Sequence, residues 1–465
     1  MEHNSARTPG WSLGRIGSFT AAVYLCTMVF YFKGPAAHSR TAKQLFAWFI
    51  CLSLLLLFRK GYKLVSNSTN ELAPTVVWFG IAFCFLACLI YPFHSTDVFG
   101  YINRGWQQVH YHQNPYVNFV ADIPAWQSDP MIWDHWIYNP NPYGFLFTLL
   151  TRVFCAIGNG HWTVTLGLFK GVNALAYGLA AWLIWSGTKN LGQAKPIVSL
   201  YLFMWNPLIL MHEIANGHND ILTGCFVLLA IYLAVAGAGL WIIPVLVTAT
   251  LLKYGPAILI PFALVFVIKN HGWKVAIYSC LIGAAIVILA ALPYIRDWRV
   301  FRLEDIASNA TLIDNSLHSF VIHIFENLAR LIKPLAQFHG RVDWLIKNTL
   351  RAGLALFLIV QALTIPRNFS AVTLARKSVL IMFVLICVVS SKFNAWYLGM
   401  ILPLALLLDA RDWLRRLIVL ISGAQLFSLT FFKQAYILNF FAMMLVPGWI
   451  VFRKNGREAG HYREQ

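Results

Sequence analysis

The chain has 465 residues, of which 59% are apolar and only 12% are charged, against about 45–50% and about 25% in soluble proteins. This composition excludes an ordinary soluble enzyme and predicts an all-α polytopic integral membrane protein. The net charge of +18 does not indicate nucleic-acid binding. Cytoplasmic loops of membrane proteins collect Lys and Arg, and no basic stretch is long or interleaved with aromatic residues.

Apolar runs suited to about 14 transmembrane helices follow one another along the chain, since a span needs roughly 20 apolar residues. They lie near 16–33, 43–58, 74–94, 163–187, 196–212, 219–237, 239–253, 255–268, 274–294, 350–365, 377–392, 395–409, 413–431 and 436–452. No cleavage site follows the first run, so it is expected to be a retained helix. The predicted parts are N-terminal helices 1–72, a core module 73–294, a second outer loop 295–349 and a C-terminal helical part 350–465 with a basic cytoplasmic tail.

The positive charges predict the orientation. With the N-terminus in the cytoplasm, every longer inner connection is basic, as the positive-inside rule requires. This holds only if the apolar run 143–157 does not cross, so that run is expected to be an interfacial helix. Most of the eighteen acidic residues then face the periplasm or cell exterior. Nucleotide sugars are absent there, so a group-transfer enzyme would need a donor carried on a lipid.

The first large outer loop, residues 95–142, carries the candidate catalytic residue Asp97. An ionisable group at the edge of an apolar run is costly and therefore usually functional or tightly paired. The loop region is rich in Trp and Tyr, including Tyr101 and Tyr143. Aromatic faces at an aqueous cleft suit sugar rings, although interfacial anchoring is the plainer explanation for any one of them.

A second polar cluster, His212 to Asp220, lies between two predicted spans on the same outer side. Glu213, Asn219 and Asp220 are candidates for binding sugar hydroxyls, and His218 for binding a phosphate. The alternative is a set of helix caps made by Asn216 and Asn219. Such residue types can also hold a divalent metal, but their spacing matches no standard zinc motif, so no metal or other cofactor is expected.

Single cations stand at outer helix ends that are otherwise poor in Lys and Arg. Lys253 and Lys392 are of this kind, and Arg104 follows Asp97 in the outer loop. A lipid phosphate would explain them, and snorkelling toward lipid headgroups is the alternative. Lys170 lies within a predicted span and must pair with a polar group there, such as a carboxylate or a phosphate.

Together these motifs resemble the polyprenyl-phosphate-mannose-dependent mannosyltransferases of the GT-C superfamily, and most closely the bacterial α-1,6-mannosyltransferases. The resemblance covers about residues 70–410. The residues that carry it are Asp97, Asn114-Pro115-Tyr116, Pro142-Tyr143-Gly144, Asn206-Pro207-Leu208, Glu213, Asn216-Gly217-His218-Asn219-Asp220, Lys253-Tyr254 and Phe393-Asn394-Ala395-Trp396-Tyr397. The chain departs from the pattern at Ala395 and Phe145, where Pro is expected or common.

The resemblance implies a GT-C glycosyltransferase fold: a core module of seven helices, interfacial helices in the first large outer loop and a variable C-terminal helical part. It also implies a polyprenyl-phosphate sugar donor, with mannose as the sugar, and makes Asp97 the catalytic base. The acceptor is expected to be a lipid or a glycan, with membrane lipids around the protein and no nucleic-acid partner.

The residues also fit an inverting glycosyl transfer in their own right. A sugar phosphate is a fair leaving group, so one carboxylate that deprotonates the acceptor hydroxyl suffices, while cations stabilise the phosphate. Lys253, Lys392, Arg104 and His218 are the candidates for those cations. The alternatives are a polyprenyl-lipid transporter or flippase, for which no internal repeat is evident, and a GT-C enzyme that uses a different lipid-linked sugar.

Overall fold

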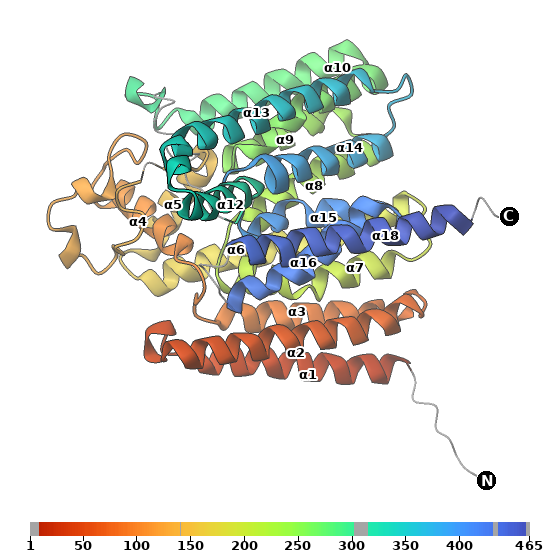
Figure 1. Ribbon diagram of the computed structural model, residues 1–465. Helices are drawn as coiled ribbons and strands as arrows, with labels where there is room; N and C mark the ends of the chain where they lie inside the picture. Colours follow the sequence, from red (N-terminus) through yellow and green to blue (C-terminus); the bar gives the residue numbers. More distant parts are fainter. Residues whose placement is uncertain (1–8, 140, 302–314, 431–435, 462–465) are drawn as a thin grey trace, which may run out of the picture.

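The computed structural model is an all-helical bundle with a layer of loops and short helices at one end (Figure 1). The structure describes residues 9–139, 141–301, 315–430 and 436–461. Residues 302–314 of the predicted second outer loop therefore lie outside the described residues. The first turn of α1 and the last turn of α18 both lie at the bundle end opposite the loop layer.

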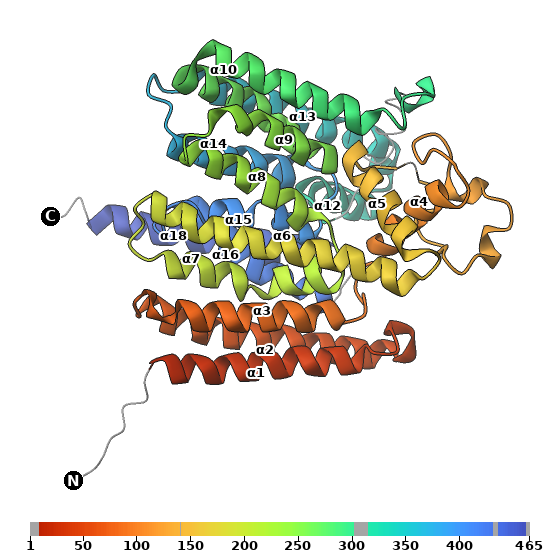
Figure 2. The same ribbon diagram turned by 180° about the vertical axis from the view of Figure 1, so that it is seen from behind.

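Three long helices form one side of the bundle (Figures 1 and 2). They are α1 (Pro9–Phe30), α2 (Arg40–Ser66) and α3 (Ala73–Leu89). Each has apolar side chains on its outer face as well as its inner one; Trp78 of α3, for example, is 73% exposed. A helix that is apolar all round is stable only where its outer face meets other apolar groups, as in a membrane.

The middle of the chain forms the core of the bundle and, with α10, the edge opposite α1 (Figure 1). Its helices are α6 (Trp162–Asn190), α7 (Pro196–Met204), α8 (Asp220–Val235), α9 (Ile242–Leu252) and α10 (Ile260–Ala291). A bend of 52° separates α7 from a π-helical turn, Ile209–Ala215. Pro207 lies at that bend, where it cannot donate a helical hydrogen bond. α10 is broken at Gly272, where φ is 84°, so the two runs predicted there form two helical arms.

The outer layer contains α4 (Asp97–Val109) and α5 (Phe145–Gly158), which pack together beside the bundle end (Figures 1 and 2). A Cβ atom at Gly105 of α4 would lie 2.3 Å from the carbonyl oxygen of Thr151. This close approach therefore requires glycine. The Asn103 side chain joins α4 to the loop by accepting a hydrogen bond from the Trp133 N–H and donating one to the Trp133 carbonyl.

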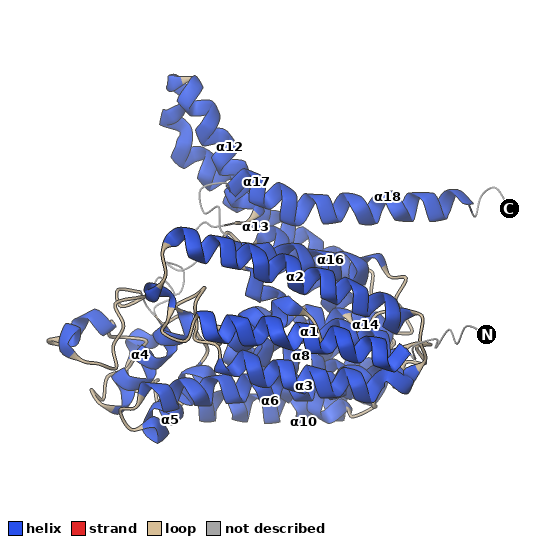
Figure 3. Ribbon diagram, turned by 90° about the horizontal axis from the view of Figure 1, so that it is seen from below, coloured by secondary structure: helices blue, strands red, loops and turns tan. Residues whose placement is uncertain are grey.

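The C-terminal part differs from the prediction in two places. Its helices are α12 (Leu317–Leu331), α13 (His339–Leu363), α14 (Ala371–Phe383), α15 (Leu402–Ala405), α16 (Trp413–Gln425), α17 (Tyr436–Phe440) and α18 (Val446–His461). The predicted span 350–365 begins earlier, at His339, and α12 and α17 project to one side of the bundle (Figure 3).

The second difference is the predicted helix 395–409, which is wrong. That stretch is a 3₁₀ turn, Ala395–Met400, followed by the four-residue α15. Irregular backbone at this depth is tolerated where protein buries it, and the segment is almost entirely buried. The Gly399 carbonyl packs so closely on α8 that a Cβ atom at Gly224 would lie 2.3 Å from it.

Within the described residues, seven helices are long and apolar enough to span a membrane, or eight if the bent pair that begins with α7 is one span. The chain is thus a multi-pass membrane protein. The count of 14 spans and the GT-C fold stay predictions, because several apolar helices, including α8, are shorter than 18 residues.

Replacing Gly105 by Ala should destabilise the outer layer. The added methyl group would meet the Thr151 carbonyl and the Cys155 thiol at 2.3 and 2.5 Å, and overpacking of this kind costs about 1–3 kcal/mol. The apparent melting temperature of the detergent-solubilised protein should fall. Gly178→Ala in α6 is the matched control, since nothing lies within 4 Å of its Cβ position. Equal melting temperatures for the two variants would contradict the packing described here.

Candidate active site

Asp97 is the first residue of α4, where the helix dipole favours a negative charge. The chain reaches it from α3 through residues 90–96, and Asn216 holds this connection in place. The Asn216 side-chain oxygen accepts hydrogen bonds from the backbone N–H groups of Phe93 (2.9 Å) and His94 (2.8 Å). Asn216 is fully buried, so the position of Asp97 depends on a fixed point inside the bundle.

Lys170 and Asn173 of α6 fix the same region. The Lys170 ammonium donates to the backbone carbonyls of Cys88 and Ile90 at the end of α3. The end of a helix leaves its last carbonyls without intrahelical partners, and two such carbonyls bind the Lys170 ammonium. They take the place of the carboxylate or phosphate that was expected from the sequence. Asn173 donates to the carbonyls of Glu213 (3.0 Å) and His218 (2.7 Å).

The electrostatic surroundings of Asp97 suit a base. Its side chain is 18% exposed. Burial raises the pKa of the Asp97 carboxyl above its usual range, while Lys392 and Lys253 act in the opposite direction. A carboxylate with a raised pKa accepts a proton more readily, which is the property required of a general base near neutral pH.

His218 lies directly against Asp97, with 3.5 Å between its Nδ1 atom and a carboxylate oxygen. Its ring stacks on the indole of Trp396 at a centroid distance of 3.9 Å. Burial, reinforced by His212, Lys253 and His94, lowers the pKa of His218 well below its usual range. A neutral imidazole at this place suits a neighbour of Asp97 better than the cationic phosphate ligand expected from the sequence.

A buried polar layer lies beneath Asp97. The Lys253 ammonium is 2.6 Å from the Asp220 carboxylate and lies over the Tyr397 ring. Burial opposes the charge on Lys253, but the adjacent Asp220 raises its pKa. Asn219 accepts a hydrogen bond from the Tyr101 hydroxyl at 3.4 Å. This layer therefore supports the base from within the bundle.

Glu213 is fully buried and accepts a hydrogen bond from the Ile221 N–H at 2.9 Å. At the start of α8 the backbone N–H of Ile221 is thus bound by Glu213. The side chain of Asn219, which the helix-cap alternative named, makes no capping bond there. Within the part of the chain that the structure describes, no group of three or more His, Cys, Asp or Glu side chains is arranged to hold a metal ion.

Asp97 opens into two cavities. The first, about 340 Å³ in volume, is called here the narrow cavity. Its lining includes four cationic side chains, those of Arg104, Lys347, Arg351 and Lys392. Arg104 is buried, and one of its guanidinium nitrogens has no hydrogen-bond partner while the other donates to the carbonyls of Trp136 and Asn139.

The charge of the narrow cavity persists at neutral pH, because burial lowers the pKa of Arg104 only to about 10. A buried donor without a partner carries a desolvation penalty, which a bound anion would remove. The narrow cavity therefore has the chemistry of an anion site next to a carboxylate.

The second cavity, about 670 Å³ in volume, is called here the wide cavity. It shares Asp97, Trp136, Lys392 and Asn394 with the narrow cavity. The Lys392 ammonium lies over the Trp136 ring at 4.9 Å from its centroid. These shared residues form a common wall between the two spaces, and Asp97 is exposed to both.

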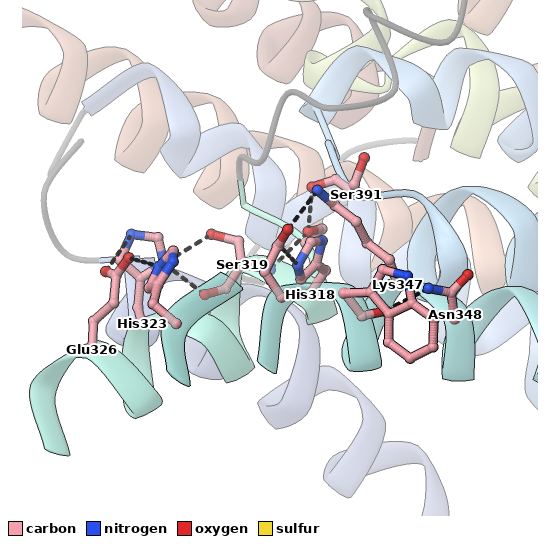
Figure 4. A network of polar contacts seen from close by, with 11 residues as sticks. His318, Ser319, His323, Glu326, Lys347, Asn348 and Ser391 are labelled. Carbon is pink, nitrogen blue, oxygen red and sulfur yellow. Dashed lines mark hydrogen bonds and ion pairs between the residues drawn. The ribbon is translucent and has the colours of Figure 1, made fainter. Parts of the chain in front are cut away.

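A polar network attaches the wall formed by α12 and α13 to the segment that carries Lys392 (Figure 4). Asp343 receives hydrogen bonds from His318 and Lys347, each at 2.8 Å. Ser316 caps α12 and donates to the carbonyl of Ser391 at 2.6 Å. This network orients Lys347 toward the narrow cavity.

Of the expected site residues, the structure brings Asp97, Arg104, Lys392 and Tyr143 together at the narrow cavity. Lys347 and Arg351 were not expected. They are four residues apart and so lie on one face of α13, but starting the predicted span at 350 left Lys347 in a loop. The i, i+4 spacing of two cations at the start of an apolar run was the signal available in the sequence.

The ion pair between Lys253 and Asp220 should be important for stability. Asp220 has a side-chain exposure of only 1%, so Lys253→Met would leave a buried charge unpaired at a cost of about 3–5 kcal/mol. The apparent melting temperature should fall, and a second change, Asp220→Asn, should restore part of it.

The pair Lys347–Asp343 is a matched control, since both of its side chains are at least 20% exposed. Pairs in contact with water contribute about 0–1 kcal/mol. A loss in Lys347→Met equal to that in Lys253→Met would contradict the burial argument.

Comparisons with known proteins identify the family of the chain. The model of the family described as alpha-(1→6)-mannopyranosyltransferase, N-terminal domain, matches residues 13–269, more than half of the chain. Alpha-(1→6)-mannopyranosyltransferase A of Corynebacterium glutamicum is 24% identical over 174 residues, which cover 37% of this chain and 34% of that relative. No solved structure matches. The matched region contains Asp97, Arg104 and the cluster from His212 to Asp220, and the chain belongs to the alpha-(1→6)-mannopyranosyltransferase family, as its motifs predicted.

Proposed function

We propose that the chain is an inverting mannosyltransferase that moves mannose from a polyprenyl phosphate to a hydroxyl group of a glycan or lipid. The observation that carries the proposal is the position of Asp97, a carboxylate with a raised pKa at the junction of a cationic cavity and a second, wider one. A base and an anion site side by side are the two groups that transfer from a sugar phosphate requires.

The donor phosphate occupies the narrow cavity in this proposal. Arg104 supplies a buried guanidinium nitrogen without a partner, and Lys392 belongs with Asp97 to the common wall. Arginine forms planar, bidentate hydrogen bonds to phosphate. Leu350 and Val389 also line the cavity, and the outer face of α13 carries exposed apolar residues such as Trp344 and Leu356, a surface suited to a polyprenyl chain.

The reaction is a single displacement. The acceptor hydroxyl oxygen attacks the anomeric carbon of mannose while its proton passes to the Asp97 carboxylate. The bond between the anomeric carbon and the phosphate oxygen breaks, and its electron pair leaves with the polyprenyl phosphate, whose charge the cations stabilise. One displacement inverts the anomeric carbon, so a β-linked donor gives an α product.

The proposed location is the inner, cytoplasmic membrane, with the active site on the periplasmic or exterior side. Support comes from the basic residues of the opposite connections, which follow the positive-inside pattern. Lys189 in the last turn of α6 and Lys195 directly before α7, for example, belong to a connection at the bundle end away from α4. A lipid-linked donor is consistent with that side, since nucleotide sugars are cytoplasmic.

Asp97→Asn should reduce mannose transfer by about 10²–10⁴-fold, the usual contribution of a general base, and should leave the fold intact. Transfer from radiolabelled polyprenyl-phosphate mannose by the purified enzyme measures this. Asp122→Asn is a matched control in the same outer loop, because Asp122 only accepts a hydrogen bond from the exposed Phe119 N–H. Retained transfer in Asp97→Asn would rule out this base.

The pH dependence should follow the same carboxyl. The base acts when deprotonated, so kcat/KM should fall as the pH falls through the raised pKa of Asp97. Lys392 lowers that pKa, so Lys392→Met should move the acid limb of the profile to higher pH, whereas Lys392→Arg should leave it in place. Identical acid limbs in wild type and Lys392→Met would show that the limb does not report Asp97.

A further inference from the structure

The wide cavity shares Asp97 with the anion site, and the rest of its lining has a different chemistry. We propose that it binds the acceptor as an oligosaccharide, with its attacking hydroxyl directed at Asp97. This inference rests on the proposed function and deepens it, since it assigns a place and a chemical class to the second substrate. A volume of about 670 Å³ falls within the range of about 300–1,000 Å³ typical of ligand pockets.

The lining of the wide cavity suits neutral sugar rings. Aromatic side chains offer their faces, and amide and hydroxyl groups offer both donors and acceptors, the combination that a ring with many hydroxyls requires. The aromatic residues are Trp136, Phe393, Trp396, Phe427 and Phe440. The amide and hydroxyl residues are Ser95, Thr96, Asn315, Asn394, Gln425, Ser428, Thr430 and Asn439.

The charges of the two cavities support different occupants. Among the described lining residues, the wide cavity contains no Lys or Arg beyond Lys392 on the common wall, whereas the narrow cavity adds Arg104, Lys347 and Arg351. A phosphate gains free energy from several cations, but an uncharged hydroxyl gains little. The asymmetry therefore favours the anionic substrate in the narrow cavity and the neutral substrate in the wide cavity.

The geometry of the reaction requires the same division. In a single displacement the attacking oxygen and the leaving oxygen approach opposite faces of the anomeric carbon. Asp97 contributes to the lining of both cavities, so a sugar carbon held beside it can meet the phosphate from one cavity and the hydroxyl from the other.

Much of the wide cavity comes from beyond the matched family region, which ends at residue 269. Gln425 belongs to α16, and Met443 to the π-helical turn Phe441–Leu445 after α17. If these residues bind the acceptor, the C-terminal part of the chain determines which glycan is extended, while the matched part supplies the base. This division predicts that changes near Gln425 and Met443 affect one substrate only.

Two substitutions test the wide cavity, one by filling part of it and one by removing a polar group, and the KM is measured for both substrates. Met443→Trp occupies part of the space, and Gln425→Ala removes one amide. Each should raise the KM for linear α-1,6-mannotriose about tenfold, equivalent to about 1.4 kcal/mol, and leave the KM for polyprenyl-phosphate mannose within about twofold. Leu445→Trp is the matched control, because Leu445 lies on the same turn but is 43% exposed and does not line the cavity.

Lys347→Met in the narrow cavity should have the opposite pattern, with a raised donor KM and an unchanged acceptor KM. If Met443→Trp behaves like Leu445→Trp, or if it raises both KM values equally, the wide cavity is not the acceptor site.

A binding measurement without donor separates this inference from the proposed function. The Asp97→Asn protein should bind mannotriose, detected by titration calorimetry, and Asp97→Asn/Met443→Trp should not. Binding that depends on Met443, combined with a wild-type enzyme that transfers no mannose from polyprenyl-phosphate mannose, would support the cavity assignment and overturn the proposed donor chemistry. Transfer by wild type with binding that is the same in both proteins would overturn the cavity assignment alone.

Discussion

The cost of keeping a carboxylate ionised at the edge of an apolar bundle governs the arrangement around Asp97. Burial penalises the charge, and the first turn of α4, Lys253 and Lys392 offset that penalty. The balance leaves the pKa of the Asp97 carboxyl raised, so its carboxylate accepts a proton more readily than an ordinary aspartate. Fixing such a group requires rigid support, which Asn216 provides from inside the membrane-spanning part.

The support is built mainly from backbone contacts. Lys170 and Asn173 of α6 bind carbonyls of other segments, and Gly217 has a φ of 75° with Val98 only 3.1 Å from its Cβ position. A side chain that binds backbone groups fixes the path of the loop itself, whatever side chains the loop carries. The polar cluster from His212 to Asp220 therefore holds the outer layer in position, in addition to offering groups that can bind a ligand.

Composition and charge predicted a multi-pass helical protein, and the motifs predicted its family, because both signals are local in the sequence. Local signals also singled out Asp97, Arg104 and Lys392, which the structure brings to one cavity. Local signals fail at residues 395–409. The apolar run there predicts a helix, but its backbone is largely irregular and packs against α8. The same signals also missed Lys347 and Arg351, because their place beside Asp97 depends on how α13, far along the chain, packs in three dimensions.

The wall that Lys392 and Trp136 form belongs to both cavities. A ligand that shifts either side chain changes the surface offered to the ligand on the other side. Binding of the two ligands is then thermodynamically linked, and by reciprocity each alters the affinity of the other by the same factor. If the donor and the acceptor occupy the two cavities, the contact between Lys392 and Trp136 couples the binding of one to the binding of the other.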